Sequence, residues 1–202
     1  MAVKDHSLDP LIIEAARQEF LTHGYQKASL HKIAERAGIT TGALYTRYKN
    51  KDALFCSLVE PVLGAMYRES EPIARLYREV QAHPSAEALL KAIRQEEQVY
   101  LNLLFEHYED CILFFCKSEG SSLQKQLREM MTMKSAETVE FFRSIAKQEL
   151  DCDGIALIMN QQFYYYRQIL EQGHSREKAL SCMKTMEIFM EAGWNALLQR
   201  ML

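Results

Sequence analysis

The amino-acid sequence predicts an all-α protein, and three features of the chain support this expectation. The 202 residues include only 8 Gly and 4 Pro, which are too few turn formers for a many-stranded β-sandwich. Apolar residues make up 48% of the chain and charged residues 25%, a composition typical of a globular protein rather than a disordered one. Apolar side chains also recur at helical spacing in segments that follow good helix-capping residues.

The N-terminal quarter of the chain predicts three short helices followed by a longer one. Asp9 and Pro10 suit the N-cap and the first turn of the first helix, because the N–H that Pro lacks would have no helical partner there. Ser29, Thr40 and Asn50 are suitable N-caps for the next three helices. Together these segments predict a small three-helix unit.

The remainder of the chain predicts a bundle of longer helices, fused to the N-terminal unit without a Gly/Ser-rich linker. We therefore expect two domains, a small one over residues 1–51 and a larger one over residues 52–202. Turn-forming residues indicate a break or kink at Pro72 and loops at 82–85, 118–122, 151–154 and 173–175.

The net charge of −3 is divided unevenly between the two predicted domains. Residues 1–51 carry a formal charge of +3, and residues 52–202 carry −6. A basic end on an acidic body indicates that this end meets a polyanion. The asymmetry is small, and it gains weight only from the motif that lies in the basic segment.

The cysteines and the apolar runs predict a cytoplasmic protein. Five cysteines are widely spread and form no CxxC pair, so we expect reduced, mostly buried thiols at Cys56, Cys111, Cys116, Cys152 and Cys182. No apolar run approaches the roughly 18 residues of a transmembrane helix, so we expect no membrane association. The first residues also lack the apolar stretch of a signal peptide.

Residues 29–48, SLHKIAERAGITTGALYTRY, have the pattern of a helix-turn-helix motif. Gly38 can adopt the positive φ that a tight turn requires, and Ile39 and Leu44 would pack between the two helices. In such motifs the second helix lies in the major groove of DNA, with its first residues facing the base edges. The outward positions of this helix carry small or hydrogen-bonding side chains and no acid, namely Thr41, Gly42, Tyr45 and Thr46. The motif therefore predicts a DNA-binding surface.

Groups suited to phosphate contact flank the second helix. Lys49 and Lys51 place cations just after it, and the N-terminus of the following helix offers free N–H groups that bind anions. Before the turn, Ser29 and Lys32 could contact the DNA backbone. The capping residue Thr40 completes this part of the predicted DNA-binding set.

The run from Ile33 to Phe55, IAERAGITTGALYTRYKNKDALF, resembles the N-terminal DNA-binding domain of the TetR family of bacterial transcriptional repressors. The resemblance covers about residues 10–60, while the rest of the chain matches only in helical character and length. Some family members use the position of His31 for groove contact, so His31 joins the predicted DNA-binding residues, with a solvated side chain as the alternative. The sequence departs from the family pattern with Ile39 for Val, Thr40 for Ser, Arg47 for His and Tyr48 for Phe.

The resemblance implies a homodimer of about nine helices per subunit, with double-stranded operator DNA as its partner. In the family, the last two helices of each subunit form a four-helix dimer interface, which here would span about residues 154–171 and 175–198. A small-molecule effector binds within the C-terminal bundle and releases a palindromic operator. On this basis the dimer interface is expected to include Phe163, Tyr166, Met186, Phe189, Met190 and Trp194.

The implied effector pocket would lie among apolar and aromatic residues between positions 100 and 170. Ligand pockets are mostly apolar with a few polar groups, and Met lets a pocket wall adapt. The candidate lining residues are Tyr100, Leu104, Phe114, Met130, Phe141, Tyr164 and Arg167. The alternative is that the apolar residues only form the core, and that Arg167 pairs with a carboxylate or reaches solvent.

Other classes of function find less support in the sequence. His107 and Cys111, at i and i+4, could ligate a metal, and Cys111 and Cys116 could form a redox pair, but neither pair has the further ligands or the shared helix face that such a site needs. No P-loop, G-x-G-x-x-G, G-x-S-x-G or H-E-x-x-H motif is present, so we predict no catalytic residue, no cofactor and no metal. A partner-binding helical adaptor without DNA binding is the alternative to a repressor, and activation instead of repression stays open.

Overall fold

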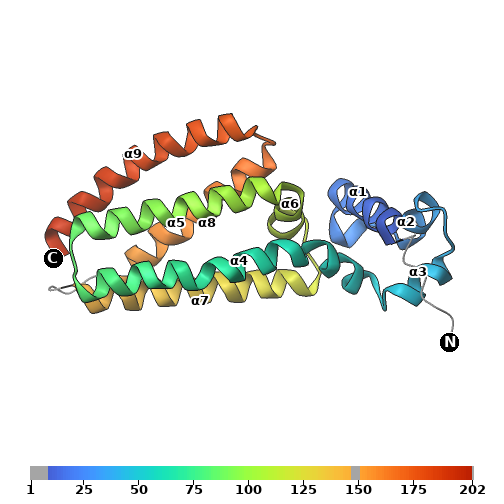
Figure 1. The fold of residues 1–202 in the computed structure, drawn as a ribbon, viewed down its shortest axis with the longest axis horizontal. Helices are drawn as coiled ribbons and strands as arrows, with labels where there is room; N and C mark the ends of the chain where they lie inside the picture. The colour runs from blue at the N-terminus through green and yellow to red at the C-terminus, as the bar shows by residue number, and fades with distance from the viewer. Residues whose placement is uncertain (1–8, 147–150, 202) are drawn as a thin grey trace. The chain divides into compact units, whose positions relative to one another are not determined.

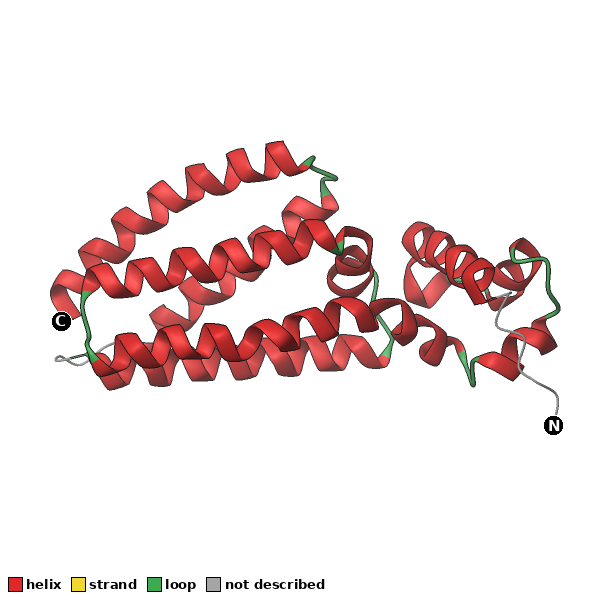
Figure 2. Cartoon of the chain, viewed as in Figure 1, coloured by secondary structure: helices red, strands yellow, loops and turns green. Residues whose placement is uncertain are grey.

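The computed structural model describes residues 9–146 and 151–201, which form helices joined by short loops (Figure 1, Figure 2). Within these ranges there are nine α-helices and no β-strand, which confirms the predicted all-α class. The helices are α1 (Asp9–Lys27), α2 (Leu30–Arg36), α3 (Thr41–Arg47), α4 (Lys51–Ala82), α5 (Ala86–Glu106), α6 (Tyr108–Cys116), α7 (Ser122–Ile145), α8 (Cys152–Glu171) and α9 (Arg176–Met201). No helix in these ranges is long and apolar enough to cross a lipid bilayer.

Side-chain caps fix the starts of several helices where the sequence predicts them. Ser29, Thr40, Asn50 and Ser85 each accept a hydrogen bond from the backbone N–H three residues further on, over 2.7–3.4 Å. The Asp151 carboxylate accepts hydrogen bonds from the backbone N–H groups of Asp153 and Gly154 at the start of α8. Such caps satisfy N–H groups that have no partner within the helix, typically contributing about 1 kcal/mol each.

Helix α4 differs from the sequence-based expectation, because it runs unbroken through both Pro61 and Pro72. A proline removes one backbone hydrogen bond from a helix, and burial of an apolar face can offset that cost. Helix α4 has such a face, since Val62, Ala65 and Ile73 are buried. Of the predicted break or kink at Pro72, the break therefore does not occur.

The helices pack into two compact units, each formed from two separate stretches of chain. The first unit comprises Met1–Leu63 and Glu109–Leu127, and the second comprises Gly64–Tyr108 and Arg128–Leu202. Helices α4 and α7 each contribute residues to both units. The predicted functional boundary after Lys51 stays a prediction, because a packing unit and a functional domain need not end at the same residue.

The first unit is built around an aromatic cluster. Phe20 of α1 and Phe55 of α4 are fully buried, and their ring centroids lie 4.9 Å apart in an edge-to-face arrangement. Tyr25 meets Phe55 edge-on at 5.2 Å. Edge-to-face pairs add to the stabilisation from apolar burial because the positive edge of one ring faces the negative face of the other.

Polar contacts join the later segment of the first unit to its N-terminal helices. The Arg17 guanidinium of α1 donates to the Asp110 carboxylate of α6, and both side chains are largely buried. Asp52, near the start of α4, accepts hydrogen bonds from the N–H and the hydroxyl of Ser122 at 2.9 and 2.6 Å. These long-range contacts were not predicted from the sequence.

The core of the second unit centres on an aromatic stack between α7 and α9. The Trp194 indole lies nearly parallel to the Phe142 ring, with centroids 5.2 Å apart and planes 7° apart. Trp194 is only 4% exposed within this single subunit. The surrounding buried residues are Val80, Leu89, Leu90, Ala92, Ile145 and Ile155.

We expect Gly38→Ala to lower the free energy of unfolding by about 1–2 kcal/mol, because Gly38 has a φ of 70° and a Cβ strains this left-handed backbone. Equilibrium urea denaturation measures the change. Gly42→Ala is the matched control, since Gly42 lies in helix α3 and an added Cβ would come no closer than 3.8 Å to Thr40 Oγ1. The control should be neutral or stabilising by up to about 1 kcal/mol. Equal losses in both variants would contradict the assigned turn.

Candidate functional site

Helices α2 and α3 form the helix-turn-helix motif that the sequence predicts. The Ile39 N–H donates to the Ala34 carbonyl at 3.0 Å, across the turn that Gly38 makes with its positive φ. Ile33 and Leu44 are buried beneath the two helices. The turn and these two anchors hold the pair of helices in the geometry of the motif.

Most of the predicted DNA-binding residues are exposed. Tyr45 has 53% of its surface exposed, and the Thr46 hydroxyl donates to the Gly42 carbonyl at 3.0 Å, which leaves its oxygen able to accept from another partner. The exposed members are His31, Lys32, Thr40, Gly42, Tyr45, Thr46 and Lys49, and the half-buried members are Ser29, Thr41 and Lys51. None of the ten is acidic. Their contact with DNA stays a prediction.

Lys51 has partners within the protein. Its Nζ donates to the Gln26 carbonyl at 3.0 Å and lies 4.9 Å from the centroid of the Tyr25 ring. Burial lowers the pKa of the Lys51 ammonium, and the Glu19 carboxylate partly opposes this change. Lys51 therefore ties the start of α4 to the end of α1, while Lys49 remains exposed.

Arg47, which stands where the TetR pattern has His, also has an internal role. Its Nε donates to the Asp9 carboxylate at 3.0 Å, and only a small part of the Arg47 side chain is exposed. The added positive charge at the end of α3 is therefore paired with the first residue of α1.

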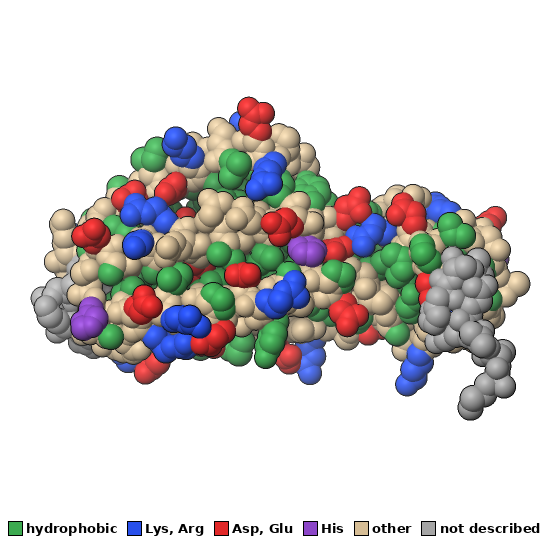
Figure 3. All heavy atoms as spheres, in the orientation of Figure 1, with side chains coloured by type: hydrophobic (Ala, Val, Ile, Leu, Met, Phe, Trp, Pro, Cys, Tyr) green, Lys and Arg blue, Asp and Glu red, His purple; other side chains and the backbone are tan. Residues whose placement is uncertain are grey.

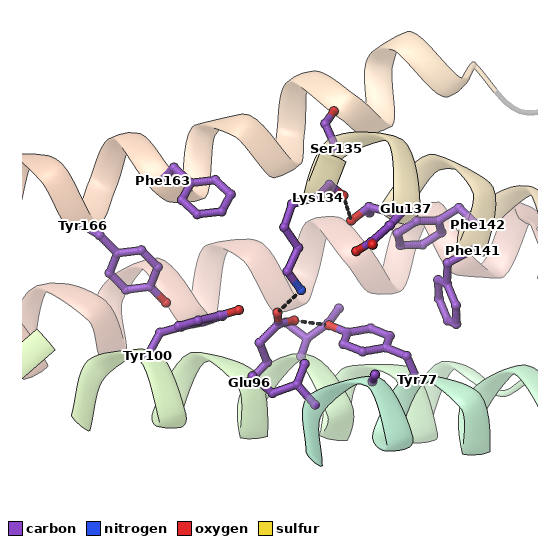
Figure 4. A pocket seen from close by; sticks show the side chains of 14 residues that line it. Tyr77, Glu96, Tyr100, Lys134, Ser135, Glu137, Phe141, Phe142, Phe163 and Tyr166 are labelled. Carbon is purple, nitrogen blue, oxygen red and sulfur yellow. Dashed lines mark hydrogen bonds and ion pairs between the residues drawn. The ribbon is translucent and has the colours of Figure 1, made fainter. Parts of the chain in front are cut away.

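The second unit contains a cavity of about 150 Å³ between α4, α5, α7 and α8 (Figure 4). Six of its fourteen lining residues are aromatic, namely Tyr77, Tyr100, Phe141, Phe142, Phe163 and Tyr166. The polar and charged lining residues are Glu96, Lys134, Ser135, Glu137 and Thr138, and the remaining aliphatic ones are Ile73, Ala74 and Ile93.

A buried carboxylate organises the polar side of the cavity. Glu96 is 9% exposed and accepts a hydrogen bond of 2.5 Å from the Tyr77 hydroxyl (Figure 4). The Lys134 ammonium lies 3.5 Å from the other carboxylate oxygen. Burial alone would lower the pKa of Lys134, but Glu96, Tyr100 and Glu137 together outweigh burial and raise it. Burial raises the pKa of Tyr77 well above its usual value, and the neighbouring Glu96 charge adds to the rise.

The structure places only two of the seven predicted effector-binding residues in the cavity wall, Tyr100 and Phe141. The prediction for Phe114 is corrected, because this ring is fully buried in the core of the first unit. Arg167 is exposed and donates to Glu171 at 2.7 Å on its own helix. The other three also lie outside the cavity lining: Leu104 is buried, Met130 is half-buried and Tyr164 is exposed.

The sequence analysis missed the charged residues of the cavity. Glu96 occupies the same helical stripe as the buried residues Leu89, Ala92 and Leu103 of α5. An acidic residue within an apolar stripe was a signal that could have pointed to this site. Lys134 and Tyr77 gave no comparable signal, because their approach to Glu96 depends on packing between helices.

The predicted dimer residues differ in how far they are buried within the subunit. Trp194 and Tyr166 are buried within the subunit, so these two are corrected from interface to interior. Phe163 is half-buried and lines the cavity, and its place in a dimer interface stays a prediction. Met186 and Met190 are half-buried. Phe189 is 75% exposed, and other large apolar side chains of α8 and α9 are exposed with it, namely Leu157, Ile158, Tyr164, Leu180 and Ile188.

The structure gives the metal and redox alternatives no further support. His107 interrupts the helical run between α5 and α6, with φ of −120° and ψ of 41°, so it does not share a continuous helix with Cys111. No group of three or more metal-ligating side chains occurs among the residues that the structure describes. Burial raises the pKa of the Cys111 thiol to about 12, and the Asp110 carboxylate and Cys116 contribute, which disfavours the reactive thiolate.

The capped pair α2 and α3 defines a helix-turn-helix protein whose second unit is all-α. Residues 12–58 match the family model described as bacterial regulatory proteins, tetR family. The crystal structure of a TetR-like transcriptional regulator from Rhodococcus sp. RHA1 has the same fold, with a TM-score of 0.57 at 17% identity over 95% of this chain and 100% of that one. The chain is therefore similar to the tetR family of bacterial regulatory proteins over residues 12–58, and its likeness to the solved structure is one of fold.

Curated relatives match only part of the chain. The HTH-type transcriptional regulator YhgD of Bacillus subtilis is 29% identical over 103 residues, which are 49% of this chain and 52% of YhgD. The HTH-type transcriptional regulator TtgR of Pseudomonas putida is 38% identical over 64 residues, which are 32% of this chain and 29% of TtgR. The chain thus spans about half of YhgD and less than a third of TtgR.

Glu97, next to the cavity residue Glu96 on α5, makes stability depend on pH. Burial raises the pKa of Glu97 from 4.5 to about 7, and the carboxylates of Glu187 and Glu96 add to the rise. The folded state therefore holds this proton more tightly than the unfolded state does. The resulting stability is fully present below pH 4.5 and is lost as the pH rises through about 7.

We expect Glu97→Gln to raise the free energy of unfolding by about 1–2 kcal/mol near pH 8, because it removes the penalty for ionising a partly buried carboxyl group. Near pH 4.5 the substitution should have little effect. Thermal melts at both pH values measure the difference. The exposed Glu79→Gln on α4 serves as the control and should show no such pH dependence. Equal behaviour of the two variants at both pH values would refute the assigned shift.

Proposed function

We propose that this protein is a sequence-specific DNA-binding transcriptional regulator, which acts as a repressor and leaves a palindromic operator when a small molecule binds. The observation that carries this proposal is the exposed, acid-free surface of a capped recognition helix, with Tyr45 and Lys49 available to DNA. Helix α3 enters the major groove, where Thr41, Gly42 and Tyr45 face base edges and phosphates. The absence of a Cβ at Gly42 permits close approach of the backbone to the DNA.

Binding to DNA would depend on a few local cations rather than on a broad positive field. On the face shown in Figure 3, acidic and basic side chains are interspersed. The net charge is −3. Long-range attraction to DNA is therefore weak, and contacts such as that of Lys49 with phosphate must supply the electrostatic part of the affinity.

The repressor would act as a homodimer. The exposed apolar side chains of α8 and α9, including Leu157, Ile188 and Phe189, suit a four-helix interface that buries them in a second subunit. A dimer of this kind presents two recognition helices to successive major grooves, about 34–36 Å apart. The interface is thus assigned to the exposed side of these helices and not to Trp194, which faces the subunit core.

The cavity of the second unit is the proposed effector site. It combines an aromatic wall with a few polar groups, as ligand pockets generally do. An effector releases DNA only if it binds more tightly to the conformation that does not fit the operator. The protein works in the cytoplasm, through binding equilibria rather than through catalysis.

Selection of genomic fragments with the purified protein, followed by sequencing of the bound DNA, tests the proposed function. One enriched palindrome is the expected result. No enrichment at low salt from folded dimer that mass spectrometry shows to be free of ligand would refute DNA binding and favour the adaptor alternative.

We expect Tyr45→Ala to weaken binding to the selected fragment by about 1–3 kcal/mol, because it removes a contact at the recognition helix. Lys49→Ala should reduce the slope of log affinity against log salt by about one, since one phosphate contact is lost. Fluorescence anisotropy with labelled DNA measures both effects. Lys91→Ala, an exposed change on α5, is the control and should leave affinity and slope unchanged. An unchanged affinity and slope in the first two variants would contradict the proposed contact surface.

A further inference from the structure

The charges that line the cavity indicate which class of ligand it takes. Three charged side chains contribute to the wall, namely the carboxylates of Glu96 and Glu137 and the ammonium of Lys134. The lining therefore carries one more negative charge than positive charge. Glu96 is buried while Glu137 is exposed, so one carboxylate lies inside the cavity and the other lies nearer to solvent.

The aromatic rings of the wall favour a cation, as the excess negative charge of the lining also does. Rings of Tyr and Phe surround the polar centre from α4, α5, α7 and α8 (Figure 4). The face of an aromatic ring is negative, and cages of such rings bind quaternary ammonium groups. A cavity of about 150 Å³ has room for a ligand of benzene size.

Lys134 occupies the position that a ligand cation would take. Its ammonium lies 3.5 Å from Glu96, at the end of a flexible side chain that is one-third exposed. Glu137 lies three residues further along α7, at a spacing that allows ion pairing on a helix surface. Glu137 is also among the groups that raise the pKa of Lys134. Lys134 can therefore exchange Glu96 for Glu137 and leave the buried carboxylate to a ligand.

We propose that this cavity binds small aromatic ammonium ions, whose cationic group replaces the Lys134 ammonium beside Glu96. The ring of the ligand lies among the aromatic side chains, and Tyr77 continues to donate to Glu96. An anionic ligand would instead meet two carboxylates around a single lysine. A neutral ligand would gain no charge interaction from Glu96 or Lys134. The inference rests on the proposed function only in treating this cavity as the effector site.

The only tryptophan of the chain provides the readout of binding. Trp194 stacks on Phe142, which forms part of the cavity wall, so an occupant changes the surroundings of the indole. The full-length protein is titrated with three probes of similar size, namely benzylammonium, benzyl alcohol and phenylacetate. We expect the cation to bind at least about tenfold more tightly than the alcohol or the anion.

Two substitutions should change the affinity for the cation in opposite directions. Glu96→Gln retains an acceptor for Tyr77 but removes the charge. It should weaken binding of benzylammonium about tenfold and change the affinity for benzyl alcohol by less than about twofold. Lys134→Met removes the competing ammonium and should strengthen binding of the cation several-fold. Lys91→Met on α5 is the control and should change neither. If Glu96→Gln does not fold, as judged by circular dichroism, Lys134→Met decides.

Several results would overturn the assignment. The first is that the cation shows no saturable binding. The second is that wild type and Glu96→Gln bind the cation equally well. The third is that Lys134→Met loses cation binding. Preferential binding of phenylacetate that Lys134→Met abolishes would identify an anion site instead.

The affinity of the protein for the selected DNA fragment is measured separately, with and without the cation. Cation binding that leaves DNA affinity unchanged would uphold the ligand class and overturn the effector role. Cation binding by a protein that selects no DNA would overturn the proposed regulator function alone.

Discussion

The burial of one carboxylate, Glu96, constrains the arrangement of the second unit. A buried charge is costly unless it is paired and hydrogen-bonded, and its partners here come from different helices. Tyr77 of α4 donates to Glu96, and Lys134 of α7 pairs with it. Loss of either partner would leave a poorly compensated charge in the interior. The three helices are therefore held at the rotations that also bring Phe141 and Phe142 to the cavity.

Local interactions explain why the helix-turn-helix could be predicted from the sequence. The caps at Ser29 and Thr40 join groups three residues apart, and the turn depends on one residue, Gly38, that tolerates a positive φ. Such features are decided by the identity of a few neighbouring residues. The same reasoning correctly placed Ser85 and Asp151 at helix starts, because their hydrogen bonds are equally local.

Features that depend on packing between helices could not be predicted in the same way. Apolar side chains occur on more than one side of α9, and the sequence does not tell which of them face the subunit core. The structure places Trp194 inside and Phe189 outside. Similarly, Phe114 has the composition expected of a pocket residue, but it belongs to the first unit because its helix α6 is joined to α1 there. The assignment of each ring follows from its neighbours and not from its residue type.

The pair between Arg47 and Asp9 has an evolutionary consequence. Arg47 replaces the His of the family pattern, and its charge is matched by the first residue of α1. Loss of one partner would remove this ion pair from the other, whose charged group is only partly exposed. The two positions should therefore vary together across relatives, with an acid at the start of the first helix wherever the recognition helix ends in arginine. Covariation at these two positions would then mark the branch of the family that joins its first and third helices by charge.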